Sequence, residues 1–407
     1  MPLRPETARQ VDAMVADAQR AGHAPSLIIG VVRDGALAHL AAAGTQPSPD
    51  ADLQYRIGSI TKTMTAVLVM QERDAGKLAL DDQLRRHLPE AAAAGRVTLR
   101  QLLGHAGGLQ REPDGPWWER NEGVDLTTLL TGFTAAKVAH PPYRYWHYSN
   151  LAFGLLGGVL ERTTGTPWSQ LVRQRILEPL GLRRTTYAAT EPFARGYVLH
   201  PWHDTLREEP RTDSRAMAPA GQLWSTVTDL ARWAAFLADP DPAVLSPATV
   251  EEMCAPVILS DLDAWRGGYG LGIQLTRDGD RVHVGHGGSM PGYVATLAVH
   301  RPSRTGVVGF ANSYGLRTGG IGPLGHRILT HVLDVEPGPT RPWTPAEAGT
   351  VRGDRVSRYA PEGPDRWRGV SGVENGEVLT VLRDEAGRPV ALDIATFVFT
   401  RDPDGEP

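Results

Sequence analysis

The β-strand signals of this 407-residue chain fall at its two ends, and helical signals fill the middle. Near the N-terminus, "SLIIGVVRDGALAHLAAAG" consists of two apolar runs around Asp34-Gly35, which predicts a hairpin. Strands return in residues 269–313, where four short apolar segments predict a meander. We therefore expect one sheet assembled from the N- and C-terminal parts with an inserted helical region, an α+β or mixed α/β architecture.

The helical signals are amphipathic or apolar segments separated by Gly- and Pro-rich loops. One of them, "ITKTMTAVLVMQERDAGKL", is strongly apolar and is ended by Gly76. The other expected helices cover residues 7–21, 97–104, 125–138, 150–164, 168–178, 226–238 and 323–334.

The C-terminal part reads as a separate module. "DVEPGPTRPWTPAEAG" is rich in Pro and Gly and predicts a linker. Beyond it, short strand signals flank the turns at residues 374–376 and 385–387. We expect a main domain over residues 1–335, a linker over 336–344 and a small β module over 345–407.

The composition narrows the range of partners. The net charge is -4, with 41% hydrophobic and 22% charged residues, and no basic run is present. Nothing here favours nucleic acid or an anionic membrane as a partner. The single cysteine, Cys254, excludes an intramolecular disulfide and a Cys-based zinc site, and we expect it to be a buried small hydrophobe. Histidines without ligand spacing and the lack of a Gly-rich phosphate loop predict no cofactor.

The N-terminal segment, "MPLRPETARQVDAMVADAQRAG", is amphipathic and has neither the apolar core nor the cleavage site of a secretory signal. No apolar stretch approaches the length of a transmembrane helix. The chain as given is therefore expected to be cytoplasmic, and its oligomeric state is not predicted.

The segment "RIGSITKTMTA" sets Ser59 three residues before Lys62 at the expected start of a helix. Lysine occurs three times in the chain, at Lys62, Lys77 and Lys137. At this spacing the Ser59 and Lys62 side chains lie on one helix face. A lysine that is desolvated near the positive end of a helix favours its neutral form and can take the proton of a serine hydroxyl. The alternative is that Ser59 caps the helix and Lys62 extends to solvent.

The segment "YRYWHYSNLAFGLLGGVL" places Tyr148 and Asn150 at the start of another helix. A tyrosine hydroxyl close to a lysine can transfer protons, and an asparagine can orient that lysine and bind a substrate carbonyl group. The alternative is an aromatic packing cluster with Ser149 or Asn150 as the helix N-cap.

The segment "HVGHGGSMPGY" contains His286-Gly287-Gly288 at the end of an expected strand. Glycines there let a ligand approach the backbone closely. The Ser289 N–H could pair with the Ser59 N–H to hold an oxyanion. The alternatives are a Gly-rich turn, or a register in which His283 begins the motif instead.

The three motifs in this order resemble the serine β-lactamase and penicillin-binding-protein superfamily, and especially the relatives of class C β-lactamases. "LALDDQLRRHLPE", "VTLRQLLGHAGGL", "ILEPLGLRRTTY" and "AGQLWSTVTDLARWAAFL" also look like connecting segments of that family. The resemblance covers roughly residues 8–335. It implies the β-lactamase/transpeptidase-like fold, in which helices flank an antiparallel sheet and an all-helical region is inserted, here with a small C-terminal β extension.

The resemblance implies that Ser59 is the nucleophile that becomes acylated and that Lys62 is its base. Tyr148 would be the general acid and base for the leaving group and for deacylation. Asn150 would orient Lys62 and bind the substrate amide.

The third motif has implied roles of its own. His286 and Gly288 would line the strand edge on the substrate's carboxyl side, and the N–H groups of Ser59 and Ser289 would form the oxyanion hole. His286 stands where efficient β-lactamases usually have Lys, which predicts a weaker cation and favours esterases, D-amino-acid peptidases and carboxypeptidases over β-lactam turnover.

The expected activity is hydrolysis of a small ester or a D-amino-acid-type amide or peptide through an acyl-enzyme. One alternative is an acyltransferase or a penicillin-binding-protein-type peptide cyclase, in which an amine replaces water. A second is a module that binds β-lactams or peptides without turnover. Arg401 near the C-terminus could reach a substrate carboxylate, although an exposed strand-end arginine is the simpler interpretation.

Overall fold

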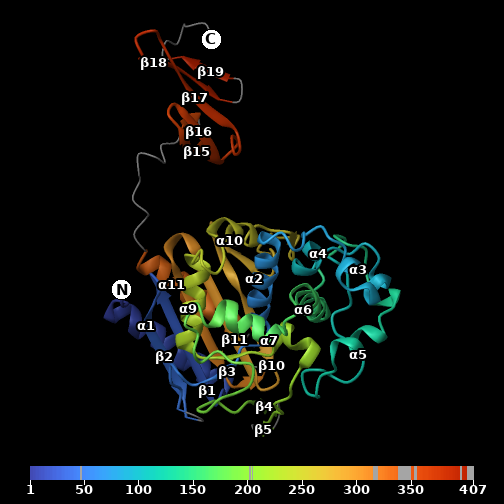
Figure 1. Cartoon of the computed structure of the whole chain (residues 1–407). Coiled ribbons are helices and arrows are strands. Elements are labelled where there is room, and N and C mark those ends of the chain that lie inside the picture. The colour runs from blue at the N-terminus through green and yellow to red at the C-terminus, as the bar shows by residue number, and fades with distance from the viewer. Residues whose placement is uncertain are drawn as a thin grey trace. The chain divides into compact units, whose positions relative to one another are not determined.

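The computed structural model describes residues 1–45, 48–200, 203, 205–314, 320–337, 350–352, 355–394 and 397–400. The chain divides into two compact units, Met1–Gly338 and Pro339–Pro407. Figure 1 labels the elements of both.

The first unit is built on an eight-stranded sheet that joins the two ends of the unit, as the strand signals predicted. The N-terminal hairpin pairs with the late strands through β1 and β12, whose residues run antiparallel from Leu27 opposite Ala311 to Arg33 opposite Thr305. The other pairings in this sheet are also antiparallel. The strand order is β2 (Ala36–Gly44), β1 (Ser26–Arg33), β12 (Thr305–Ala311), β11 (Tyr293–His300), β10 (Arg281–Met290), β9 (Gln274–Asp278), β8 (Gly267–Tyr269) and β7 (Ile258–Leu259).

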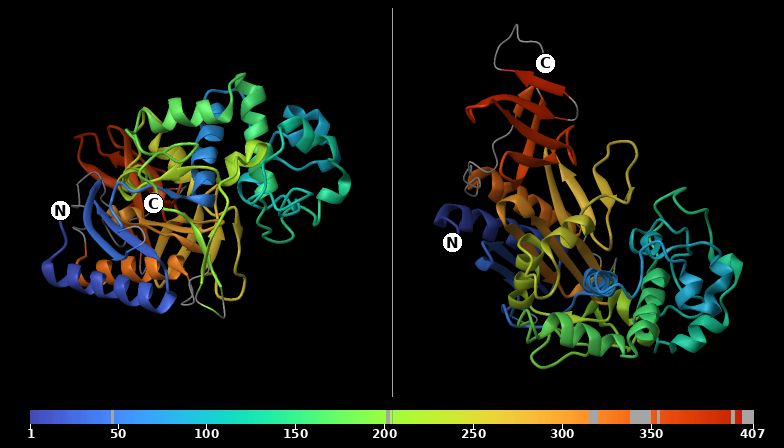
Figure 2. Two further views of the ribbon diagram at one scale, coloured as in Figure 1. Left: turned by 90° about the horizontal axis from the view of Figure 1, so that it is seen from below. Right: turned by 45° about the horizontal axis from the view of Figure 1, so that its top comes forward.

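Both faces of this sheet are covered, which explains why β1 is apolar at nearly every position and is buried throughout. Because side chains alternate along a strand, Leu27 and Ile29 pack in one apolar cluster while Ile28 and Val32 pack in another. The first cluster includes side chains of α1 (Pro5–Gly22) and α11 (Ile321–Val335), and the second includes α9 (Val227–Ala238). Figure 2 shows α1 and α11 side by side on one face of the sheet.

The middle of the chain forms the expected helical region. The α-helices there are α2 (Thr61–Asp74), α3 (Leu84–His87), α4 (Leu99–Leu103), α5 (Leu126–Thr131), α6 (Asn150–Thr164), α7 (Trp168–Val172), α8 (Ala218–Gly221) and α10 (Pro247–Met253). Short 3₁₀ or π turns are η1 (Gly58–Ile60), η2 (Pro89–Ala94), η3 (Ala135–Lys137), η4 (Arg173–Leu177), η5 (Arg215–Met217) and η6 (Arg301–Ser303). Small sheets are formed by β3 (Tyr55–Arg56) with β6 (Trp224–Ser225), and by β13 (Ser313–Tyr314) with β4 (Tyr197–Leu199) and β5 (Leu206–Glu208).

Two expected helices are wrong in detail. The helix expected over 125–138 ends at Thr131, because Gly132 favours termination and Thr134 is extended, so only a 3₁₀ turn follows. The helix expected over 168–178 changes to a π turn after Val172. Among the helices that the structure describes, none has the length and apolar character needed to cross a membrane.

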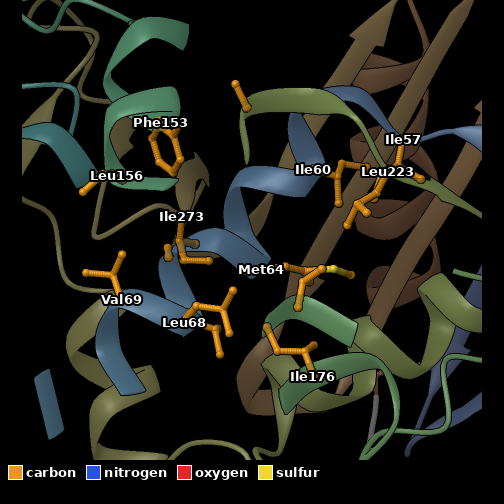
Figure 3. Packing of buried hydrophobic residues seen from close by; sticks show 14 of the residues in the cluster. Ile57, Ile60, Met64, Leu68, Val69, Phe153, Leu156, Ile176, Leu223 and Ile273 are labelled. Carbon is orange, nitrogen blue, oxygen red and sulfur yellow. The ribbon is translucent and has the colours of Figure 1, made fainter. Parts of the chain in front are cut away.

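Helix α2 lies at the centre of the main apolar core. Met64, Leu68 and Val69 are fully buried, and Figure 3 shows them near Phe153 of α6 and Ile176. Every residue of α2 from Thr61 to Met70 is buried, polar ones included, so the start of α2 is held by packing from several elements. The expected buried cysteine, Cys254, is partly buried and packs against this core.

The second unit is a six-stranded antiparallel sheet in chain order, which confirms the expected small C-terminal β structure. Its strands are β14 (Thr350–Arg352), β15 (Arg355–Gly363), β16 (Arg366–Ser371), β17 (Val378–Arg383), β18 (Pro389–Ile394) and β19 (Phe397–Thr400). Tyr359, Leu379 and Ile394 form its apolar cluster. Arg401 and most of the expected linker lie outside the described residues.

Candidate active site

Ser59 lies in η1, the turn that leads directly into α2. Its hydroxyl group is 3.0 Å from Lys62 Nζ and is also hydrogen-bonded to the Tyr148 side chain. The N-cap of α2 is Ile60, and no side chain caps that helix. The interpretation of Ser59 as a helix cap is therefore wrong, because its hydroxyl group is occupied by two side chains.

Lys62 does not extend to solvent, since its side chain is fully buried. Burial lowers the pKa of Lys62 to about 7, and the carboxylates of Glu112 and Glu119 oppose that shift. At neutral pH a large fraction of this side chain is therefore an uncharged amine.

The hydrogen bonds of Lys62 decide where the lone pair of that amine points. Nζ lies 2.6 Å from Asn150 Oδ1 and 2.6 Å from the carbonyl oxygen of Ala220. Both oxygens can only accept, so the neutral amine donates its two N–H groups to them. Its lone pair is then left for the third neighbour, the Ser59 hydroxyl group, which can donate to it.

Tyr148 and Asn150 reach the site from the start of α6. Ser149 is the N-cap of that helix and accepts from the Ala152 N–H, which confirms the capping interpretation for Ser149. Tyr148 packs against His105, with ring centroids 4.3 Å apart, and its ring centroid is 5.0 Å from Lys62 Nζ. Burial raises the pKa of Tyr148 well above its ordinary value, so its hydroxyl group stays protonated.

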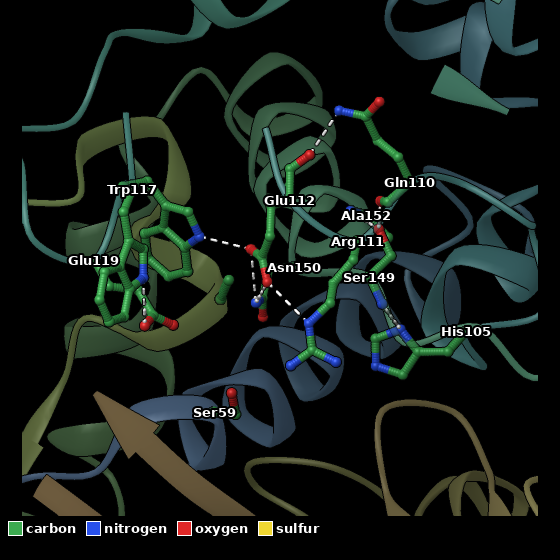
Figure 4. Close-up of polar contacts among 12 residues, drawn as sticks. Ser59, His105, Gln110, Arg111, Glu112, Trp117, Glu119, Ser149, Asn150 and Ala152 are labelled. Atoms are coloured by element: carbon green, nitrogen blue, oxygen red, sulfur yellow. Dashed lines mark hydrogen bonds and ion pairs between the residues drawn. The ribbon is translucent and has the colours of Figure 1, made fainter. Parts of the chain in front are cut away.

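A charged loop that the motif analysis missed completes this side of the site. Glu112 accepts from Asn150 Nδ2 at 2.9 Å and 3.0 Å, from Trp118 Nε1 at 2.7 Å and from Arg111 Nε at 3.0 Å. These contacts fix which end of the Asn150 amide faces Lys62 (Figure 4). The available signal was the run "QREPDGPWWE", where four charged residues and two tryptophans occupy a Pro- and Gly-containing loop.

Strand β10 approaches the start of α2 through two glycines. Its pairing with β9 ends at Gly285, and the residues that follow approach the backbone at Ile57 and Gly58. A Cβ at Gly288 would lie 2.0 Å from the Ile57 carbonyl oxygen, and one at Gly58, where φ is 52°, would lie 2.5 Å from the Ser289 nitrogen. Only glycines allow this approach, which brings the Ser289 backbone beside the turn that carries Ser59.

The structure separates the two histidines of the third motif. His286 faces Tyr148, with ring centroids 6.1 Å apart, and its Nε2 is 2.5 Å from the Tyr269 hydroxyl group. His283 instead stacks on His326 of α11, with Nδ1 atoms 3.2 Å apart. Of the two possible registers, the one that begins at His286 lies beside the site.

The expectation that His286 supplies a weak positive charge is wrong. Burial and the neighbouring Lys62 lower its pKa to about 3. Its Nδ1 contacts the Gly287 carbonyl oxygen, so this nitrogen carries the proton and Nε2 accepts from Tyr269. His286 is thus a neutral ring with both nitrogens in use.

The structure brings the residues of the three sequence motifs together around Ser59. Comparison with known proteins identifies the family of the chain. The family model described as Beta-lactamase matches residues 11–322. The chain belongs to the Beta-lactamase family. Residues 331–401 match a second model, described as a domain of unknown function (DUF7586). Within the described ranges, no group of three or more His, Cys, Asp or Glu side chains could hold a metal ion.

Individual relatives differ in their stated activities. Beta-lactamase-like protein 2 of Dictyostelium discoideum is 29% identical over 63% of this chain, and esterase EstB of Burkholderia gladioli is 32% identical over 50% of it. The chain spans about half the length of these relatives, 49% and 57% respectively. The crystal structure of a D-stereospecific amidohydrolase from Streptomyces sp. is 27% identical and has a TM-score of 0.64. That comparison covers 75% of this chain and 94% of the other.

Proposed function

We propose that this chain is a serine hydrolase that cleaves a small ester or a D-amino-acid-type amide or peptide through an acyl-enzyme on Ser59. The observation that carries the proposal is the buried Lys62 amine, whose two N–H groups are taken by carbonyl oxygens and whose lone pair is left for Ser59. The esterase and the D-stereospecific amidohydrolase among its relatives support the choice of substrate class.

In the first half-reaction, Ser59 Oγ attacks the substrate carbonyl carbon and its proton passes to Lys62 Nζ. The negative charge that develops on the carbonyl oxygen would be held by the N–H groups of Ser59 and Ser289. The bond to the leaving group then breaks, and the Tyr148 hydroxyl group gives its proton to the departing atom. The proton that Lys62 took from Ser59 then returns to Tyr148, whose ring lies beside Lys62 Nζ, so both groups are restored for the second half-reaction.

In the second half-reaction, water attacks the acyl carbon and its proton passes to Lys62 Nζ, directly or by way of the Tyr148 hydroxyl group, and Lys62 then gives a proton to Ser59 Oγ. The bond from the acyl carbon to Ser59 Oγ breaks, and that oxygen regains its proton. Asn150 binds the acyl amide or ester oxygen while its Oδ1 keeps Lys62 oriented. Its amide orientation is fixed by Glu112 throughout.

The test is the intact mass of the protein after brief exposure to a p-nitrophenyl ester, a penicillin and a D-alanyl peptide thioester. We expect an adduct on the wild type that decays within minutes and none on Ser59→Ala. Lys62→Met should acylate far more slowly than Lys77→Met, a matched change at an exposed lysine. An equal adduct on Ser59→Ala, or neither adduct nor product with any of the three probes, would contradict the proposal.

A further inference from the structure

The backbone at Arg111 is tied to the turn that carries the second motif. Its carbonyl oxygen accepts the N–H groups of Asn150 at 2.7 Å and Leu151 at 3.2 Å. The neighbouring Gln110 carbonyl oxygen accepts from the Ser149 hydroxyl group at 2.7 Å. The position of Arg111 relative to Tyr148 and Asn150 is therefore set by main-chain hydrogen bonds.

The Arg111 side chain is hydrogen-bonded at Nε, whereas its two terminal amino groups are available to a ligand. Its Nε donates to Glu112, and the guanidinium carbon is 5.2 Å from the centroid of the Tyr148 ring. The side chain is nevertheless 63% exposed, and neither terminal amino group has a hydrogen-bond partner within the part of the chain that the structure describes. Figure 4 shows the guanidinium group beside Glu112 and Asn150, above Ser59 in that view.

The other basic side chains packed around Tyr148 cannot bind an anion in this way. Lys62 is fully buried, and its hydrogen bonds are taken by protein oxygens and Ser59. His286 is a buried neutral ring whose two nitrogens are occupied. His105 is buried, and its Nδ1 accepts the Ser149 N–H. Arg111 alone in this group combines a permanent charge with exposed donors.

We propose that Arg111 binds a carboxylate of the substrate through its two terminal amino groups, which makes acidic esters or amides the preferred substrates of this site. The inference rests on the proposed function, since it names the substrate class of that same site. A planar guanidinium group held at Nε presents two parallel N–H donors, the geometry that a carboxylate accepts. The oxygens of Glu112 already accept from Asn150, Trp118 and Arg111 Nε, so Glu112 serves as the anchor.

The carboxylate could belong to the acyl group or to the leaving group, and matched pairs of esters distinguish the two. For the acyl group, mono-p-nitrophenyl glutarate is compared with p-nitrophenyl methyl glutarate. For the leaving group, 3-acetoxybenzoate is compared with 3-acetoxybenzamide. In each pair the reacting bond is the same and only the remote charge differs, so the measured quantity is the ratio of kcat/KM for the acid to kcat/KM for its neutral partner.

We expect the wild type to favour the acid in at least one pair, and Arg111→Gln to lower that ratio about tenfold, the size of a lost charged hydrogen bond. Arg111→Lys should keep part of the preference for the acid, because lysine keeps the positive charge but lacks the two parallel N–H donors of the guanidinium group. Arg144→Gln is the matched control, since Arg144 is an exposed arginine stacked on Tyr145 whose loss changes the net charge equally. Any general effect of Arg111→Gln on Lys62 alters both members of a pair and cancels in the ratio.

The inference is overturned if the wild type favours the acid in neither pair, if Arg111→Gln leaves the ratio unchanged, or if Arg144→Gln lowers it as much. In each of these cases the esters are still hydrolysed by the wild type and not by Ser59→Ala, so the proposed function survives. If the wild type hydrolyses none of the four esters, or Ser59→Ala hydrolyses them equally fast, the proposed function fails and this inference fails with it.

Discussion

The substitution Glu112→Gln tests whether the charged loop tunes the general base. Glutamine keeps the size of the side chain and one oxygen acceptor for Asn150, but it removes the negative charge. The Glu112 carboxylate opposes the lowering of the Lys62 pKa, so its removal should lower that pKa further. The direction of the change in the Lys62 pKa is fixed, because the loss of a nearby negative charge disfavours the protonated amine.

The size of this pKa shift follows from the distance between the Lys62 ammonium group and the Glu112 carboxylate. Two hydrogen bonds and one amide group separate them, with 2.6 Å from Lys62 to Asn150 and 2.9 Å from Asn150 to Glu112. Unit charges about 7 Å apart interact by about 2 kcal/mol at an effective dielectric constant of about 20. Glu112 is 39% exposed, so solvent screening reduces this value. We therefore expect the pKa of Lys62 to fall by about one unit.

The scarcity of lysine makes a direct assay practical. With lysine labelled by ¹³C at Cε, the three side chains at 62, 77 and 137 give three signals, and Lys77→Arg and Lys137→Arg assign them. The Lys62 signal should titrate near pH 7 in the wild type and about one unit lower in Glu112→Gln. The midpoint of kcat/KM against pH for a neutral ester should move in the same direction.

The control for this experiment is Glu122→Gln, which makes the same charge change at an exposed position of the same loop. It should leave the Lys62 midpoint in place. The reasoning is refuted if Lys62 titrates near its ordinary value of 10.5 in the wild type, or if its midpoint does not fall in Glu112→Gln.

Three further predictions follow from the same contacts. Tyr148→Phe should lower kcat by about 100-fold or more while weakening binding much less, because general acid catalysis contributes at least that factor; a wild-type kcat would exclude its proton transfer. His286→Ala should reduce kcat/KM of the neutral ester more than His283→Ala does, since only His286 faces Tyr148; the opposite order would reverse the register. Lys62→Met should raise the free energy of unfolding, relative to the wild type, most below pH 7. Between about pH 7 and pH 10.5 the unfolded wild type still has a protonated Lys62 while the folded wild type has a neutral one, and this difference favours the folded state. Urea unfolding should show wild-type stability rising by about 1.4 kcal/mol per pH unit between these values relative to the variant, and a constant difference would contradict a buried neutral Lys62.

The sequence by itself determined the frame of the main unit. The hairpin around Asp34-Gly35 and the late meander predicted one sheet joined from both ends, and the pairing of β1 with β12 confirms it. The strongly apolar segment that Gly76 follows predicted a helix, and α2 confirms it. These features were readable because local periodicity and turn residues are properties of short segments. The spacing of Ser59 and Lys62 likewise predicted that their side chains would meet.

Only the tertiary structure decided the electrostatics of the candidate site. The desolvation of Lys62 depends on Asn150 and on the Ala220 carbonyl oxygen, which is 158 residues away along the chain. The neutrality of His286 depends on burial beside Lys62, with the Tyr269 hydroxyl group bonded to Nε2, and the sequence pattern had suggested a weak cation. The loop with Arg111 and Glu112 carries no periodic signal, and it joins the site through contacts with α6 across 38 residues. Burial and charge pairing are set by what packs from elsewhere in the chain, so no short pattern can encode them.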